Sequence, residues 1–145
     1  MIVGGISLGG LATVSCTTFT VDTLIDDPNG VIRDPDVSFD GRRVLFSFCD
    51  HTQQDTKQRR FLIYEASVDG RKLRQVTGTS LDPMQGWEGR KTVLIEDFDP
   101  CYLPDGRIIV NSNAPYQSVP CWHGTADKFV ANLYVMNADG SNMRR

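Results

Sequence analysis

One hairpin pattern occurs twice in this chain and constrains its fold more than any other feature. The two copies are DPDVSFDGRRVLFSF (34–48) and DPCYLPDGRIIVNSN (99–113). In each copy a short extended segment leads into an Asp-Gly pair, and an apolar segment follows. Aligning the Asp-Gly pairs matches Asp34 with Asp99 and Phe46 with Asn111. Two copies of one hairpin in a short chain indicate a tandem structural repeat.

A second hairpin follows each copy and is also repeated. The aligned stretches are LIYEASVDGRKLRQ (62–75) and LYVMNADGSNMRR (133–145). Both contain a Tyr (Tyr64, Tyr134), then Asp-Gly, then an Arg (Arg74, Arg144). Each unit is therefore expected to have four antiparallel strands. Asp-Gly is typical of type I′ turns, in which both central residues have positive φ. We expect such turns at Asp40–Gly41, Asp69–Gly70, Asp105–Gly106 and Asp139–Gly140.

Short apolar runs separated by Gly and Pro predict an all-β chain. The expected strands are 18–25, 36–39, 43–48, 61–67, 72–77, 92–96, 108–112 and 129–137, with a last strand starting at 141. We assign residues 1–30 to a preceding unit or N-terminal extension and residues 31–79 to a first four-stranded unit. Residues 80–145 are a connector and a second unit, truncated in its last strand.

Composition narrows the class of protein. The 145 residues suffice for one ordinary domain with a core. The net charge is -3, with acids and bases interspersed, which gives no footprint for nucleic acid. No apolar run reaches the roughly 18 to 20 residues that a membrane helix needs. The first residues are apolar but lack the early Lys or Arg of a signal peptide. A lipoprotein-like segment ending at Cys16 stays open.

Four-stranded antiparallel units in tandem are typical of β-propeller blades. The pattern P-x-x-S/L-x-D-G, a strand ending in F-S or N-S, and a second Asp-Gly resembles TolB-type, WD40-like propeller repeats. The strings VIRDPDVSFDGRRVLFSF, DFDPCYLPDGRIIVNSN, VPCWH and LYVMNADGSNMRR together resemble the middle domain of the hydrazine synthase alpha subunit family. This resemblance implies a blade architecture and export, to the periplasm or beyond. It does not imply hydrazine synthesis, because the chain has no Cys-x-x-Cys-His haem motif.

A propeller closes with about 4 to 8 blades. The chain supplies about two units and part of another, so we expect a fragment of a larger exported protein. A cytoplasmic location stays open. Open blade edges expose unpaired strands, and association through them is expected.

The cysteines have three competing interpretations. Cys101 lies in a strand and Cys121 in the following loop, so they are candidates for a disulfide in an exported protein. Cys49-Asp50-His51 and Cys121-Trp122-His123 are both Cys-x-His, so Cys49, His51, Cys121 and His123 could supply the four ligands of a tetrahedral zinc site. Their one-residue spacer is shorter than usual. Free thiols with unrelated histidines are the third interpretation. No other cofactor is expected.

Other candidate sites are weaker. The chain contains no G-x-S-x-G nucleophile motif. Asp97, Asp99 and Asp105 lie near one another in sequence and are candidates for a calcium site, but we interpret them as structural, because Asp105 belongs to a turn and Asp34 repeats Asp99.

Trp87 and Trp122 are large aromatic residues in expected loops. They either form a binding surface on one propeller face or cover the end of a core.

The sequence therefore predicts a binding or scaffolding module without catalysis of its own. Its partner would be another protein or the other domains of a parent chain. The alternative is the propeller part of a multi-domain, metal- or haem-containing oxidoreductase subunit whose active centre lies outside this chain.

Overall fold

The computed structural model describes residues 2–4, 10–15, 17–18, 20–52, 54, 59–79, 95–114 and 130–145. All regular structure in these ranges is antiparallel β-sheet, which confirms the predicted all-β class. Within the same ranges no helix has the length and apolarity needed to cross a membrane.

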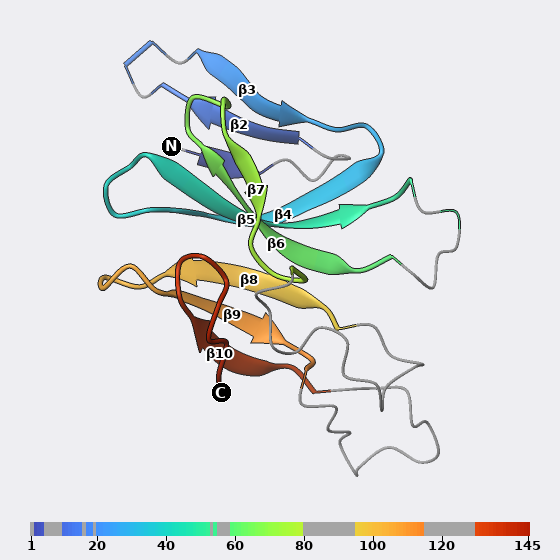
Figure 1. Ribbon diagram of the computed structural model, residues 1–145. Coiled ribbons are helices and arrows are strands. Elements are labelled where there is room, and N and C mark those ends of the chain that lie inside the picture. Colours follow the sequence, from blue (N-terminus) through green and yellow to red (C-terminus); the bar gives the residue numbers. More distant parts are fainter. Residues whose placement is uncertain are drawn as a thin grey trace.

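The strands form three sheets that lie face to face, with the central sheet between the other two (Figure 1). The N-terminal sheet contains β1 (Ile2–Gly4), β2 (Gly10–Val14) and β3 (Val21–Asp26). The central sheet contains β4 (Gly30–Val37), β5 (Arg43–Asp50), β6 (Phe61–Ser67) and β7 (Leu73–Gln75). The C-terminal sheet contains β8 (Asp97–Tyr102), β9 (Ile108–Ser112) and β10 (Asn132–Met136). A bridge between Val135 and Arg144 adds the start of a fourth strand to this last sheet.

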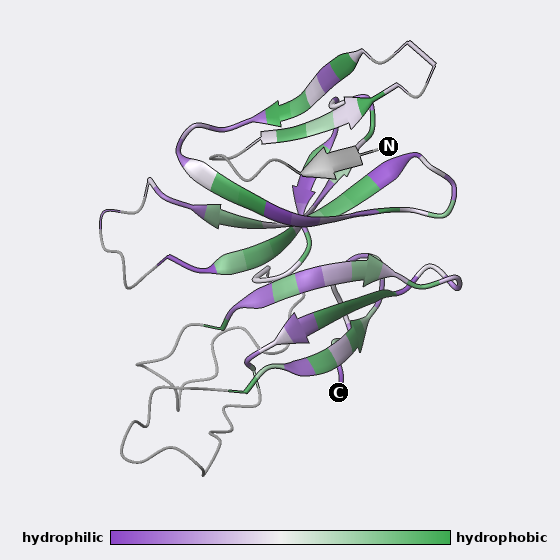
Figure 2. Cartoon of the chain, turned by 180° about the vertical axis from the view of Figure 1, so that it is seen from behind, coloured by the Kyte–Doolittle hydropathy of each residue, from purple (hydrophilic) through white to green (hydrophobic). Residues whose placement is uncertain are grey.

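Two hydrophobic clusters fill the spaces between the sheets. The cluster between the N-terminal and central sheets contains Leu11, Ile32, Val44, Phe46 and Ala66. The cluster between the central and C-terminal sheets contains Leu45, Ile63, Val76, Tyr102, Ile108, Val110, Ala114, Tyr134, Met136 and Met143. The neighbours Val44 and Leu45 belong to different clusters, because successive strand residues point to opposite faces. The central sheet is therefore covered on both faces. In the C-terminal sheet β9 begins with an apolar run and ends in polar residues (Figure 2).

The four Asp-Gly turns are not of type I′, so that prediction was wrong. Only the glycines have positive φ, at 70° to 88°, and the aspartates do not. In the first turn the Gly41 N–H donates to the Ser38 carbonyl at 2.8 Å, and the Arg42 N–H donates to Asp40 Oδ1 at 3.1 Å. Asp69, Asp105 and Asp139 accept the same bond from the residue two positions on. The aspartate thus caps the turn with its side chain, and only the glycine takes the left-handed conformation.

A β-bulge at the Asp-Pro pair that opens each of the two repeated hairpins is a further repeated feature. Asp34 and Asp99 have φ of 55° and 50°, and the pairing register of β4 and of β8 shifts at these residues. Short polar side chains tolerate this conformation better than other non-glycine residues do. The bulge lets the strand continue past the proline. As a result β4 begins at Gly30, whereas the sequence predicted a strand starting only at Asp36.

The two hairpins differ by one residue in their turns. The Ser38 N–H donates to the carbonyl of Arg43, five residues on, whereas the Leu103 N–H donates to that of Arg107, four residues on. The predicted match of Phe46 with Asn111 is therefore wrong by one position.

Ser47 is the residue equivalent to Asn111. Ser47 pairs with the residue before Asp34, and Asn111 with the residue before Asp99. The Ser47 hydroxyl donates to Asp34 Oδ2 at 3.4 Å, and Asn111 Nδ2 donates to Asp99 Oδ2 at 2.9 Å. Both side chains thus reach the carboxylate of the bulge in their own hairpin.

Several strand ends also differ from the prediction. β3 begins at Val21, β7 covers only Leu73–Gln75, and β5 continues to Asp50 because Asp50 pairs with Gly30. Residues 92–94 of the strand expected at 92–96 lie outside the described residues, and 95–96 precede β8 without joining a strand.

Candidate functional site

The proposed disulfide stays a prediction, because Cys121 lies outside the described residues. Cys101 is exposed on β8, and its thiol donates to the Tyr102 carbonyl at 3.4 Å. Desolvation, followed by the nearby Asp36 carboxylate, raises the pKa of the Cys101 thiol. No disulfide joins Cys49 to Cys101, the two cysteines that the structure describes.

The proposed zinc set is also only half described, since Cys121 and His123 lie outside the described ranges. Cys49 is buried in β5, and desolvation, followed by Glu96, raises the pKa of its thiol. His51 follows β5, and its backbone N–H donates to the Asn29 carbonyl at 2.7 Å. Among the residues with described positions, no three His, Cys, Asp or Glu side chains are placed to share a metal ion. Trp87 and Trp122 fall in undescribed segments as well.

The aspartates around the second hairpin bind within the fold. Asp105 accepts from the backbone N–H of Arg107 at 3.1 Å and from its Nε at 2.8 Å. Asp99 accepts from Asn111, as described above. These contacts agree with the structural interpretation of Asp99 and Asp105.

A charged cluster between the central and C-terminal sheets is the most distinctive polar feature of the described chain. Its centre is Glu65 on β6, whose side chain is only 8% exposed. Glu65 Oε1 accepts from the Tyr102 hydroxyl at 2.7 Å and lies 3.4 Å from Arg43 Nη1. Glu65 Oε2 accepts from Arg74 Nε at 2.7 Å. A buried carboxylate needs such partners to offset the loss of its hydration.

Strand pairing explains why these groups meet. Glu65 pairs with Leu45 on β5 and with Arg74 on β7, so these side chains share one face of the central sheet. Arg43 lies two residues before Leu45 and is therefore on the same face. That face turns toward β8, from which Tyr102 contributes its hydroxyl. The cluster therefore forms only where the two sheets are packed together.

The C-terminal sheet also fixes the two arginines. Arg74 Nη2 donates to the Ala138 carbonyl at 2.6 Å. The Arg43 guanidinium lies over the Tyr102 ring, 5.5 Å from its centroid. Desolvation, followed by the hydrogen bond to Glu65, raises the pKa of Tyr102. Tyr102 therefore stays a neutral donor to Glu65 over the ordinary pH range.

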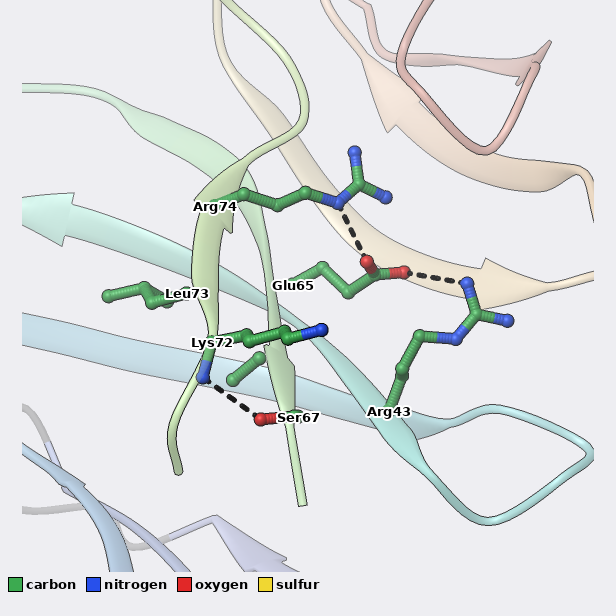
Figure 3. A pocket seen from close by; sticks show the side chains of 7 residues that line it. Arg43, Glu65, Ser67, Lys72, Leu73 and Arg74 are labelled. Carbon is green, nitrogen blue, oxygen red and sulfur yellow. Dashed lines mark hydrogen bonds and ion pairs between the residues drawn. The ribbon is translucent and has the colours of Figure 1, made fainter. Parts of the chain in front are cut away.

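A pocket of about 320 Å³ opens beside this cluster (Figure 3). Its lining consists of Arg43, Glu65, Ala66, Ser67, Lys72, Leu73 and Arg74. The arginine side chains are 42% and 40% exposed, whereas Glu65 is nearly covered. The Lys72 N–H donates to Ser67 Oγ at 3.0 Å, which holds this segment against the end of β6. The two arginine side chains at the pocket are thus partly exposed to solvent, where their guanidinium groups can pair with an anionic group.

The sequence patterns above do not single out Glu65. A usable signal is present in LIYEAS, because Ile63 and Glu65 fall on the same face of one strand. A charged residue on an otherwise apolar strand face indicates a buried ion cluster or a site. Arg74, four residues after Gly70, is the partner of Glu65 that the second hairpin supplies. Tyr102 and Arg43 come from other strands, so this hairpin does not indicate them.

Comparison of the chain with protein-family models gave no match, and comparison with curated proteins gave none either.

Proposed function

We propose that this chain is a β-propeller-type module that acts by binding, as a scaffold for a protein partner or for other domains of a parent chain. The observation that carries the proposal is the repetition of one hairpin geometry in sheets stacked face to face. Asp34 and Asp99 occupy matching bulges, and each of the four Asp-Gly turns has the same cap. Tandem antiparallel sheets of this kind build propellers, which bind ligands and partners through their loops and faces.

The outer face of the C-terminal sheet supports the proposal independently. Ile63 of the central sheet is fully buried, because the C-terminal sheet covers it. Leu133 occupies the equivalent position in β10 and is 60% exposed. This open face also includes the half-buried Ile109 and Val135. It is equivalent to the face of the central sheet that is buried against the C-terminal sheet. We propose that another antiparallel sheet of the same type packs on it.

The resemblance of the repeated hairpins to TolB-type repeats, and to the hydrazine synthase alpha middle domain, also supports this proposal. We also propose that the protein is exported from the cytoplasm, as this resemblance implies. The proposal includes no haem chemistry.

Sedimentation velocity over a wide range of concentrations tests the open face, with a second copy of the chain as the available sheet. The chain should self-associate, and Leu133→Glu should shift it to monomers, because a carboxylate cannot be buried there without a partner. Phe39→Glu is the matched control, since Phe39 is 74% exposed at a turn away from this face. Monomers at every concentration, or equal effects of the two substitutions, would contradict the proposed packing.

A further inference from the structure

The pocket beside β7 holds more positive charge than its own carboxylate neutralises. Three cationic side chains, Arg43, Lys72 and Arg74, and one anionic side chain, Glu65, line it. Asp40 and Asp139 lie near Arg43 and Arg74 but do not line the pocket. Figure 3 shows both arginines reaching Glu65 from opposite sides, while Lys72 extends along the same pocket. The surplus positive charge favours an anionic ligand.

Glu65 cannot neutralise all three cations. Its two oxygens already accept from Tyr102 and from the two arginines. The Lys72 ammonium has no hydrogen-bond partner among the residues that the structure describes. Each arginine also keeps N–H groups that none of the contacts described above uses. The pocket therefore offers several charged donors to a group arriving from solvent.

These donors are held in place before any ligand arrives. Arg74 is fixed from two sides, by Glu65 and by the Ala138 carbonyl, and Arg43 rests over the Tyr102 ring. Binding to donors that are already ordered costs less side-chain entropy. Guanidinium groups suit carboxylates because they can donate two parallel hydrogen bonds.

The pocket adjoins a strand edge, and this decides the kind of ligand. Among the described strands β7 is the last of the central sheet, and its Leu73 is 58% exposed. An extended peptide can pair with such an edge through its backbone while its side chains enter neighbouring pockets. We propose that β7 and this pocket bind an extended acidic segment of a protein. A carboxylate of that segment lies between Arg43, Lys72 and Arg74, and an apolar neighbour covers Leu73.

This inference goes beyond the proposed function and uses a different surface from the open face of the C-terminal sheet. Either surface can therefore fail its test without the other. Calorimetric titration with a capped peptide of alternating Glu and Val tests the inference, with the corresponding Gln-Val peptide as the neutral probe. The Glu-Val peptide should bind, and the Gln-Val peptide should bind at least about tenfold more weakly, as expected for one lost charge-assisted hydrogen bond.

Substitutions in the chain locate the binding. Lys72→Glu should weaken binding of the Glu-Val peptide at least about tenfold, because it replaces an attraction by a repulsion. Arg71→Gln is the matched control, since Arg71 is highly exposed, pairs with Asp69 at 3.7 Å and does not line the pocket. It should change the affinity by about twofold or less. Both variants should unfold at the wild-type urea midpoint within error.

The unmodified chain offers a second measurement. Added salt should weaken binding of the Glu-Val peptide and leave binding of the Gln-Val peptide unchanged, because salt screens the attraction between opposite charges. The inference is overturned if neither peptide binds, if both bind equally, or if Lys72→Glu has no more effect than Arg71→Gln. It is also overturned if inorganic phosphate alone competes as well as the peptide, because the pocket would then be a small-anion site.

Discussion

The central and C-terminal sheets share one hairpin plan but have different surroundings. Ile63 and Leu133 are equivalent, yet the first is fully buried and the second is 60% exposed. Glu65 and Val135 are also equivalent, and only Glu65 lies in an ion cluster. Aspartates and glycines within each hairpin determine its turns and bulge, whereas burial depends on the sheet that packs against it. Matched substitutions in the two sheets therefore separate local geometry from packing.

The largest contrast is expected for the equivalent pair Ile63 and Leu133. Ile63→Ala should lower the free energy of unfolding by about 2 to 5 kcal/mol, because it leaves a cavity between two sheets. Leu133→Ala should lower it by about 0.5 kcal/mol or less, because the side chain is largely in water. Urea unfolding monitored by circular dichroism, at concentrations where the chain is monomeric, measures both. Equal losses would show that the two faces have the same environment.

Two turn glycines give the next contrast. Gly140→Ala should cost about 2 to 4 kcal/mol, because its Cβ would overlap the Val76 carbonyl and its φ is 88°. Gly106→Ala should cost about 1 to 2 kcal/mol, from backbone strain alone, since a Cβ there meets no atom within 4 Å. The same unfolding measurement applies. If Gly106→Ala costs as much as Gly140→Ala, the Asp139–Gly140 turn does not pack against Val76.

Glu65 and Val135 give a smaller contrast. Glu65→Gln should lower the free energy of unfolding by about 1 to 3 kcal/mol, because it removes the acceptor charge for two arginines that are partly hydrated. Val135→Gln should change it by about 1 kcal/mol or less, since that residue is half-buried on the open face. A double-mutant cycle between Glu65→Gln and Arg74→Gln should show coupling. Additive effects would mean that the ion cluster does not form in solution.

Alkaline pH gives the smallest effect. The pKa of Tyr102 is raised above its ordinary value of 10.0, so the folded chain keeps a proton that the unfolded chain releases. The contribution of Tyr102 to stability is complete below about pH 10 and is lost as the pH rises above it. The free energy of unfolding, measured by urea unfolding at several pH values above about 10, should therefore fall with pH, and this fall should be smaller in Tyr102→Phe. The fall that remains includes the contribution of Tyr64, whose pKa is also raised by desolvation. An unchanged fall in Tyr102→Phe would place the Tyr102 hydroxyl in water.

The repeated hairpins could be predicted from the sequence because their signals are local. Asp-Gly and Asp-Pro pairs mark the turns and bulges, so the matching of Asp34 with Asp99 and of Tyr64 with Tyr134 holds in the structure. The turn type could not be predicted in the same way. Asp40 stabilises its turn by accepting a backbone N–H, and that contact does not require positive φ.

The candidate site could not be predicted because its parts come from distant segments. Glu65 and Tyr102 are 37 residues apart and meet only when two sheets pack together. Val135 replaces Glu65 in the other unit, so the repeat gives no second copy of the cluster to compare. Among the residues that the sequence did favour, Cys121, His123, Trp87 and Trp122 lie outside the described residues, whereas Cys49, His51 and Cys101 are described.

Hydroxyl-radical footprinting of Ile63 and Leu133 tests the stacked arrangement most directly, because both side chains react similarly when exposed. We expect strong modification of Leu133 in dilute protein and protection of Ile63 at every concentration. Modification of Leu133 should fall as the protein associates through the open face. Equal modification of Ile63 and Leu133 in dilute, folded protein would contradict the central claim that one face is covered by a neighbouring sheet and its counterpart is open.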